Sequence, residues 1–263
     1  MIGPHNARNS RAIFSALLER EIRGRFVGSI GGWVWTLVHP LLLLAIYALI
    51  FRIIFRVQFP QLGQHAFVSF VAVGLWPWLA FQEGVLRGAQ AVQANSGLVK
   101  KVAFSHELLV YSAVAATFAI HLAGFAVVLA VLALAGQDIV FWGILASLPV
   151  LAVLFLLTSA LALLCGALQV FLRDLEQVLS PLLMVLFYAT PVLYPLSLVP
   201  AWLGDVMQLN PLVHFVEAIR GLILYGAFRP GWGAVLAVAG ALAAFLVGRS
   251  VFRRLSPHFE DFL

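Results

Sequence analysis

The 263-residue chain is poor in charge: Lys, Arg, Asp and Glu together make up 10% of it, while 63% is hydrophobic. Soluble domains carry about 25% charged residues, so the composition excludes an ordinary soluble enzyme and a disordered protein. A single cysteine, Cys165, excludes an intrachain disulfide and a thiolate metal cluster. Lysine occurs only at 100 and 101, and neither follows glycine, so the phosphate loop G-x-x-x-x-G-K-[ST] is absent.

Charge-free runs dominate what is present. Six runs of 19 or more residues contain no Lys, Arg, Asp or Glu: 26–51, 57–82, 108–137, 139–172, 177–204 and 230–248. About 20 apolar residues cross a bilayer as a helix, whereas barrel strands alternate polar and apolar residues. The sequence therefore predicts an all-α membrane protein with six transmembrane helices, at about 33–55, 67–90, 108–135, 142–171, from 177 onward, and 231–251.

The basic residues predict the orientation of these spans. With both termini in the cytoplasm, twelve basic residues lie inside and four outside, which agrees with the positive-inside bias. The inside set is Arg8, Arg11, Arg20, Arg23, Arg25, Arg87, Lys100, Lys101, Arg173, Arg249, Arg253 and Arg254; the outside set is Arg52, Arg56, Arg220 and Arg229.

The N-terminal region is predicted as a loose tail over 1–8 followed by an amphipathic helix over 9–28. Apolar residues recur at three- and four-residue spacing, and acidic residues precede arginines by four, as in Glu19–Arg23 and Glu21–Arg25. Such a helix lies on the membrane surface, or alternatively docks on protein. Residues 29–255 then form the membrane domain, and 256–263 a cytoplasmic C-terminal tail.

The region 190–230 is predicted to form short helices at the outer side. Pro191, Pro195 and Pro200 interrupt the fifth span. The following stretch is too short to cross twice and too apolar for a free loop, so helices that dip into the outer leaflet and return fit it best. Glu217 and Arg220 are three residues apart and can pair.

A search for catalytic or metal-binding residues finds none. "HELLV" at 106–110 begins like the zinc motif H-E-x-x-H, but Val110 replaces the second histidine. No acidic residue is predicted in the middle of a span; Glu83 comes closest, with Arg87 as its partner, which disfavours proton coupling. His39 and His121 are interpreted as isolated packing donors.

Aromatic residues, 13% of the chain, cluster on three of the spans. The candidates for the lining of a translocation channel are Trp33, Tyr47, Phe51, Trp76, Tyr188 and Tyr194. Aromatic faces suit sugars and a polymer that slides; the alternative is that these rings form interfacial belts.

Several stretches together resemble a known family: "REIRGRFVGSIGGWVWTLVHPLL" at 20–42, "NSGLVKKVAFSHELL" at 95–109, "FLRDLEQVLSPLL" at 171–183, "FYATPVLYPLSLVP" at 187–200, "LNPLVHFVEAIRGLILYG" at 209–226 and "FEDFL" at 259–263. In this order they resemble the ABC-2 type transporter permeases, in particular the branch that exports O-antigen and related polysaccharides, with capsule and teichoic-acid permeases as near relatives.

The resemblance implies a half-transporter without its own nucleotide site or cofactor. Two copies would form a homodimer in the bacterial cytoplasmic membrane, and two separate ATPase subunits would bind ATP and Mg beneath it. The cargo would be a lipid-linked glycan within membrane lipids, and no nucleic acid is involved.

The resemblance also assigns residues. It implies an ATPase-coupling segment, which we call the coupling segment (95–106), with Asn95, Leu98, Lys100, Lys101 and Phe104 as its contact residues. The interface helix would touch the ATPase through Arg20, Arg23 and Arg25. An outer gate would comprise Pro195, Trp202, Asn210, Pro211, Glu217 and Arg220.

Two alternatives remain open from the sequence. One is an exporter of drugs or small lipids with the same fold. The other is a membrane scaffold that assembles a polysaccharide synthase without transporting anything.

Overall fold

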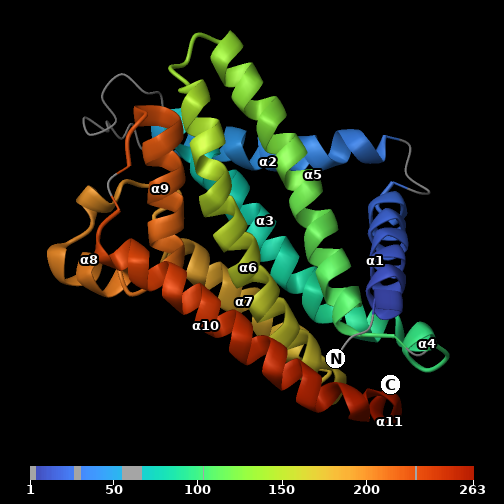
Figure 1. The fold of residues 1–263 in the computed structure, drawn as a ribbon. Coiled ribbons are helices and arrows are strands. Elements are labelled where there is room, and N and C mark those ends of the chain that lie inside the picture. Colours follow the sequence, from blue (N-terminus) through green and yellow to red (C-terminus); the bar gives the residue numbers. More distant parts are fainter. Residues whose placement is uncertain (1–3, 27–30, 55–66, 103, 229) are drawn as a thin grey trace.

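A computed structural model describes residues 4–26, 31–54, 67–102, 104–228 and 230–263 (Figure 1). Every regular element in these ranges is helical. The expectation of an all-α protein is therefore confirmed.

Four helices are long and apolar enough to cross a membrane. They are α3 (Phe67–Ala94), α5 (Glu107–Leu134), α6 (Phe141–Phe171), and α10 (Trp232–Leu255), which continues through η4 (Ser256–His258) into α11 (Phe259–Phe262). A 28-residue helix such as α3 is roughly 42 Å long, more than the hydrocarbon core requires. These four correspond to the predicted second, third, fourth and sixth spans.

The predicted first and fifth spans are helical but too short to count as crossings, so six spans are not confirmed. The apolar part of the first, Val38–Phe51, runs through α2 (Gly32–Ala48) into the π-helix η1 (Leu49–Ile54). Figure 1 shows α2 running across α5 rather than alongside it. The fifth, α7 (Leu175–Tyr188), ends just before Pro191, because the residue that precedes a proline disfavours helical geometry.

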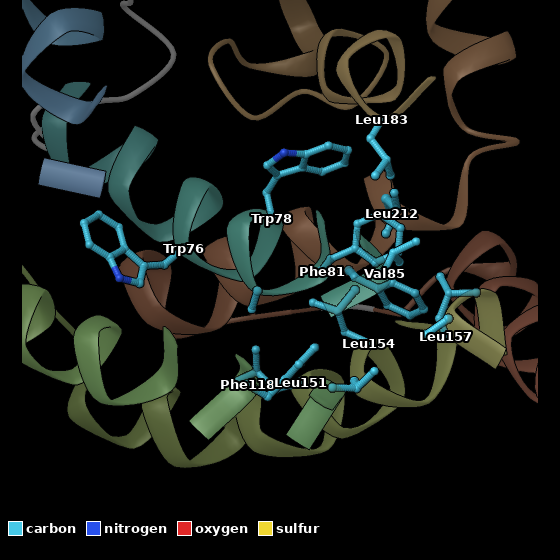
Figure 2. Close-up of a cluster of buried hydrophobic side chains, with 14 of the residues drawn as sticks. Trp76, Trp78, Phe81, Val85, Phe118, Leu151, Leu154, Leu157, Leu183 and Leu212 are labelled. Carbon is cyan, nitrogen blue, oxygen red and sulfur yellow. The ribbon is translucent and has the colours of Figure 1, made fainter. Parts of the chain in front are cut away.

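Small residues bring the long helices together. A Cβ on Gly88 of α3 would lie 2.5 Å from Ala162 of α6, and one on Gly248 of α10 would lie 2.4 Å from the Ala160 carbonyl oxygen. Close approach at small residues is how helices pack in membranes. Between them lies a core from five helices, shown in Figure 2, with Phe81 and Val85 of α3 near its centre.

The N-terminal helix α1 (Pro4–Gly24) begins earlier than expected, so 4–8 is helical rather than a loose tail. Its apolar side packs against α5, with Leu17 buried, while Ser15, Ala16, Glu19 and Arg23 are exposed. α1 therefore docks on the helix bundle, and its position at the membrane surface stays a prediction.

The connections gather at two ends of the helix bundle. Figure 1 shows α4 (Ser96–Val99), the α6–α7 connection and α11 at one end, and the α5–α6 turn with α9 (Pro211–Tyr225) at the other. The expected short helices of the 190–230 region are η3 (Leu196–Leu198), α8 (Ala201–Met207) and α9.

Candidate functional site

A cavity of about 660 Å³ opens between α2, α3, α5 and α7. One wall is aromatic: Phe187 stacks on Tyr47 with ring centroids 6.2 Å apart, and lies 5.4 Å from Trp78. Tyr188 completes this wall, and Gln82, Glu83, His121 and Ser180 add polar groups to the lining. Apolar and aromatic walls with a few polar groups are typical of ligand sites.

Two of the six predicted lining residues, Tyr47 and Tyr188, line this cavity. Trp76 does not line it and is buried in the core. Trp78, which belongs to the same aromatic cluster but is not among the six candidates, lines it instead. Figure 2 shows the two tryptophans pointing in different directions, as residues two apart on a helix do.

The other three candidates lie elsewhere or cannot be assigned. Phe51 packs against Phe67, with ring centroids 5.5 Å apart. The Tyr194 hydroxyl donates to the Tyr188 carbonyl oxygen and so connects the chain that follows α7 to the last residue of that helix. The side chain of Trp33 lies outside the described part of the structure.

Glu83 is the centre of a charged cluster at the cavity. Its carboxylate contacts Arg87 Nε at 2.6 Å, Arg25 Nη1 at 3.2 Å and His121 Nε2 at 2.6 Å. Arg25 also donates to the Thr117 hydroxyl of α5. The cluster therefore joins three parts of the chain, with Arg25, Arg87 and His121 around one carboxylate.

This cluster corrects two sequence-based interpretations. His121 is not isolated, and Glu83 lies near the midpoint of α3, which extends to Ala94. The available signal was that ionisable groups in apolar spans pair with one another. That rule links Glu83 with His121 although they are 38 residues apart.

The three arginines of the interface helix have different surroundings. Arg20 donates to the Asn95 side-chain oxygen, so α1 touches the coupling segment directly. Arg23 pairs with Glu19 as predicted, and both are exposed. Arg25 is 10% exposed and pairs with Glu83 instead of the expected Glu21. Its guanidinium therefore faces the interior of the bundle and not the surface where an ATPase subunit would bind.

The coupling segment contains the short helix α4, which Asn95 precedes. Lys100 and Lys101 are exposed, as a surface that meets another protein requires, while Leu98 and Phe104 are half-buried. Burial lowers the pKa of the His106 imidazole, although the Glu260 carboxylate raises it. The lowered pKa favours the neutral imidazole at pH 7, which packs as an aromatic ring.

Arg220, predicted at the outer gate, is fully buried and joins α9 to two other segments. Its Nε donates to the Phe70 carbonyl oxygen at 3.1 Å, and its two terminal nitrogens donate to the carbonyl oxygens of Pro191 and Val192. The guanidinium carbon lies 3.6 Å from the Phe70 ring centroid, and Nη1 lies 3.2 Å from Glu217. The predicted Glu217–Arg220 pair is present, but backbone carbonyls are the main partners.

The remaining gate candidates begin the short helices or face outward. Asn210 caps α9, because its side-chain oxygen accepts from Leu212 N at 3.0 Å while its nitrogen donates to the Thr190 hydroxyl at 2.9 Å. Pro211 follows as the first helical residue, where its missing N–H costs nothing. Pro195 is buried before η3, and Trp202 is 70% exposed on α8.

Metal-ligating residues do not gather in the described ranges: no group of three His, Cys, Asp or Glu side chains there could hold an ion. The described residues form a cavity with aromatic and polar walls, an exposed basic turn at one end of the helix bundle, and short helices at the other end. Such features suit passage and mechanical coupling.

Comparison with known proteins agrees with this architecture. Residues 13–224 match the family described as ABC-2 type transporter. The chain is 27% identical to the O-antigen export system permease protein RfbA of Klebsiella pneumoniae, over 94% of this chain and 93% of that protein. It is 30% identical to the protein of the same name from Myxococcus xanthus, over 95% of each.

A further relative is the polysialic acid transport protein KpsM of Escherichia coli, at 26% identity over 90% of this chain and 91% of that protein. The family match covers most of the chain, and the relatives are matched nearly end to end. The chain is an integral membrane protein that belongs to the ABC-2 type transporter family.

Proposed function

We propose that this chain is the membrane-spanning permease half-subunit of an ABC exporter that moves a polysaccharide, such as a lipid-linked O-antigen, across the bacterial cytoplasmic membrane. The observation that carries the proposal is near-full-length similarity to O-antigen and polysialic acid export proteins. The aromatic and polar cavity supports it, because flat rings beside hydrogen-bonding groups suit sugar units.

A separate ATPase subunit would drive this transport with ATP and Mg. The chain itself lacks a phosphate loop, so the energy must come from a partner. Two permease copies would enclose the channel, and the exposed apolar surfaces of α2, α7 and α10 leave room for a second copy and for lipid.

Both termini would lie in the cytoplasm. Lys100, Lys101, Arg173 and Arg254 belong to the bundle end that holds α4 and α11, which supports this orientation by the positive-inside bias (Figure 1). Of the four basic residues expected outside, only the Arg220 side chain falls within the described residues.

At the other end, α8 and α9 would act as the outer gate. Asn210 is hydrogen-bonded to Thr190, and Arg220 to the Phe70 carbonyl oxygen. These bonds indicate that the two helices would move together with the start of α3 and the chain after α7.

The test is deletion of the gene in its host, followed by complementation with wild-type and variant permease. Deletion should abolish surface polysaccharide, detected on immunoblots, and the wild-type chain should restore it. The permease purified alone should hydrolyse no ATP, whereas its complex with the ATPase should. Unchanged surface polysaccharide together with drug hypersensitivity would instead support the drug-exporter alternative.

A variant of the coupling segment sharpens this test. Val99 N–H donates to the Asn95 carbonyl oxygen at 3.1 Å, so Val99→Pro removes this bond and breaks α4. The variant should insert in the membrane normally yet export nothing. Val99→Ala keeps the amide donor and should export; normal export by Val99→Pro would contradict the assignment of the segment.

A further inference from the structure

The coupling segment is too short to hold its own conformation. Its helix α4 has only four residues, and isolated helices of this length do not persist in water. The geometry of the segment must therefore come from its neighbours. One of them is α1, through the hydrogen bond from Arg20 to Asn95 at the beginning of the segment.

The C-terminal helix α11 holds the other end of the segment. The Phe259 ring stacks on His106, with centroids 6.1 Å apart and planes 23° from parallel. His106 in turn meets Phe104 edge to face at 5.4 Å. Offset stacks and edge-to-face pairs at such distances are the favoured aromatic geometries. α11 also contacts α4 itself.

Phe259 is buried between the coupling segment and two long helices. Its side chain is 0% exposed, and it also packs edge to face on Phe252 of α10 at 5.3 Å and against Phe171 of α6 at 6.1 Å. One ring therefore connects the coupling segment to the ends of two long helices. A C-terminal tail that did not pack on the bundle would leave this ring in water.

A buried carboxylate strengthens the same junction. Glu107, the first residue of α5 and 5% exposed, pairs with Arg249 at 3.2 Å and with Arg253, both on the last turns of α10. The chain between α4 and α5 is thus joined to the C-terminal part by charges as well as by rings.

We propose that the C-terminal helix α11 supports the coupling segment and that Phe259 is the residue that positions this segment for the ATPase; the role of the ATPase rests on the proposed function. The turn 95–106 and α11 then move as one body, so a push on the exposed Lys100–Lys101 turn is passed directly to α6 and α10.

The first experiment needs no partner protein. Hydrogen exchange is measured over 95–106 in the full-length permease in lipid nanodiscs, for the wild type, Phe259→Ala and Phe262→Ala. Phe262 is the matched control, because it is a phenylalanine of the same helix, is 53% exposed and packs on Phe171 at 4.8 Å. Phe259→Ala should speed exchange about tenfold, while Phe262→Ala should stay close to wild type.

The outcomes separate the proposal from a general loss of folding. Unchanged exchange over 95–106 in Phe259→Ala overturns it, as does equal loosening in both variants. If Phe259→Ala does not fold, Phe259→Leu serves in its place, since leucine keeps an apolar side chain but cannot stack on His106. Exchange in the middle of α5 reports whether the fold itself survives.

The second experiment measures binding of the ATPase to the reconstituted permease. Because only the ordered segment can dock, the apparent affinity falls in proportion to the ordered population of the segment, so Phe259→Ala should bind the ATPase more weakly than the wild type. Phe259→Leu should recover part of the affinity. Wild-type affinity in Phe259→Ala overturns the positioning role, whereas a wild-type permease that binds no ATPase refutes the proposed function and leaves the exchange result standing.

Discussion

Arg220 provides the most direct test of how the outer helices are held. The substitution Arg220→Met keeps an unbranched side chain of similar reach but removes every donor. The Phe70, Pro191 and Val192 carbonyl oxygens then lose their bonds to a side chain that is 1% exposed. The stacking of the guanidinium on the Phe70 ring is lost as well.

The expected loss of stability follows from these contacts. A hydrogen bond to a charged group contributes about 1.5–3 kcal/mol, but three do not add, because removing the arginine also removes the cost of burying its charge. We expect a net loss of about 3 kcal/mol in the free energy of unfolding. At about 2–4 °C per kcal/mol for a chain of this size, the unfolding temperature should fall by about 10 °C.

The assay is thermal unfolding of the detergent-solubilised permease with a thiol-reactive dye. Cys165 is the only cysteine and is partly buried in α6, so its exposure reports unfolding. Glu217→Gln is the matched control. It should cost little, because the carboxylate is 42% exposed and Arg220 keeps its three carbonyl partners.

A second substitution tests the same reasoning from the other side of the contact. A Cβ on Gly74 would lie 2.4 Å from Arg220 Nη2, so Gly74→Val should displace the guanidinium and lower the unfolding temperature similarly. If Arg220→Met unfolds within about 2 °C of the wild type, the idea that this residue holds the outer helices is refuted.

Two further substitutions test the ends of the bundle. Asn210→Ala removes the cap of α9 and the bond to Thr190, so the unfolding temperature should fall by about 3 °C, as a lost cap of about 1 kcal/mol implies; no shift would contradict the cap. Glu107→Gln keeps the shape but not the charge between Arg249 and Arg253, so exchange of the first α5 amides should rise severalfold, and unchanged exchange would show that the pairs are not needed.

The sequence determined the membrane class and most helix boundaries. The spans predicted from the charge-free runs lie within four residues of the bounds of α3, α5, α6 and α10, since each apolar span must satisfy its own backbone hydrogen bonds in lipid. Proline placement likewise predicted the end of α7 and the short helices that follow. These are local properties, which depend on neighbours in the chain.

Only the tertiary structure decided which side chains meet. Trp76 and Trp78 are both aromatic residues of the same predicted span and are both buried, yet only Trp78 lines the cavity, because their directions on α3 differ. Arg25 pairs with Glu83, 58 positions away, and not with the expected Glu21, because α1 packs along α5.

The C-terminal tail shows the same division. The sequence marks "FEDFL" as a short, mixed segment that a free tail could contain. Its burial against His106, Phe171 and Phe252 depends on three helix ends that meet at one end of the bundle, and no local pattern encodes that meeting. Helix formation depends on residues three and four apart, whereas contacts between helices depend on packing that spans the whole chain.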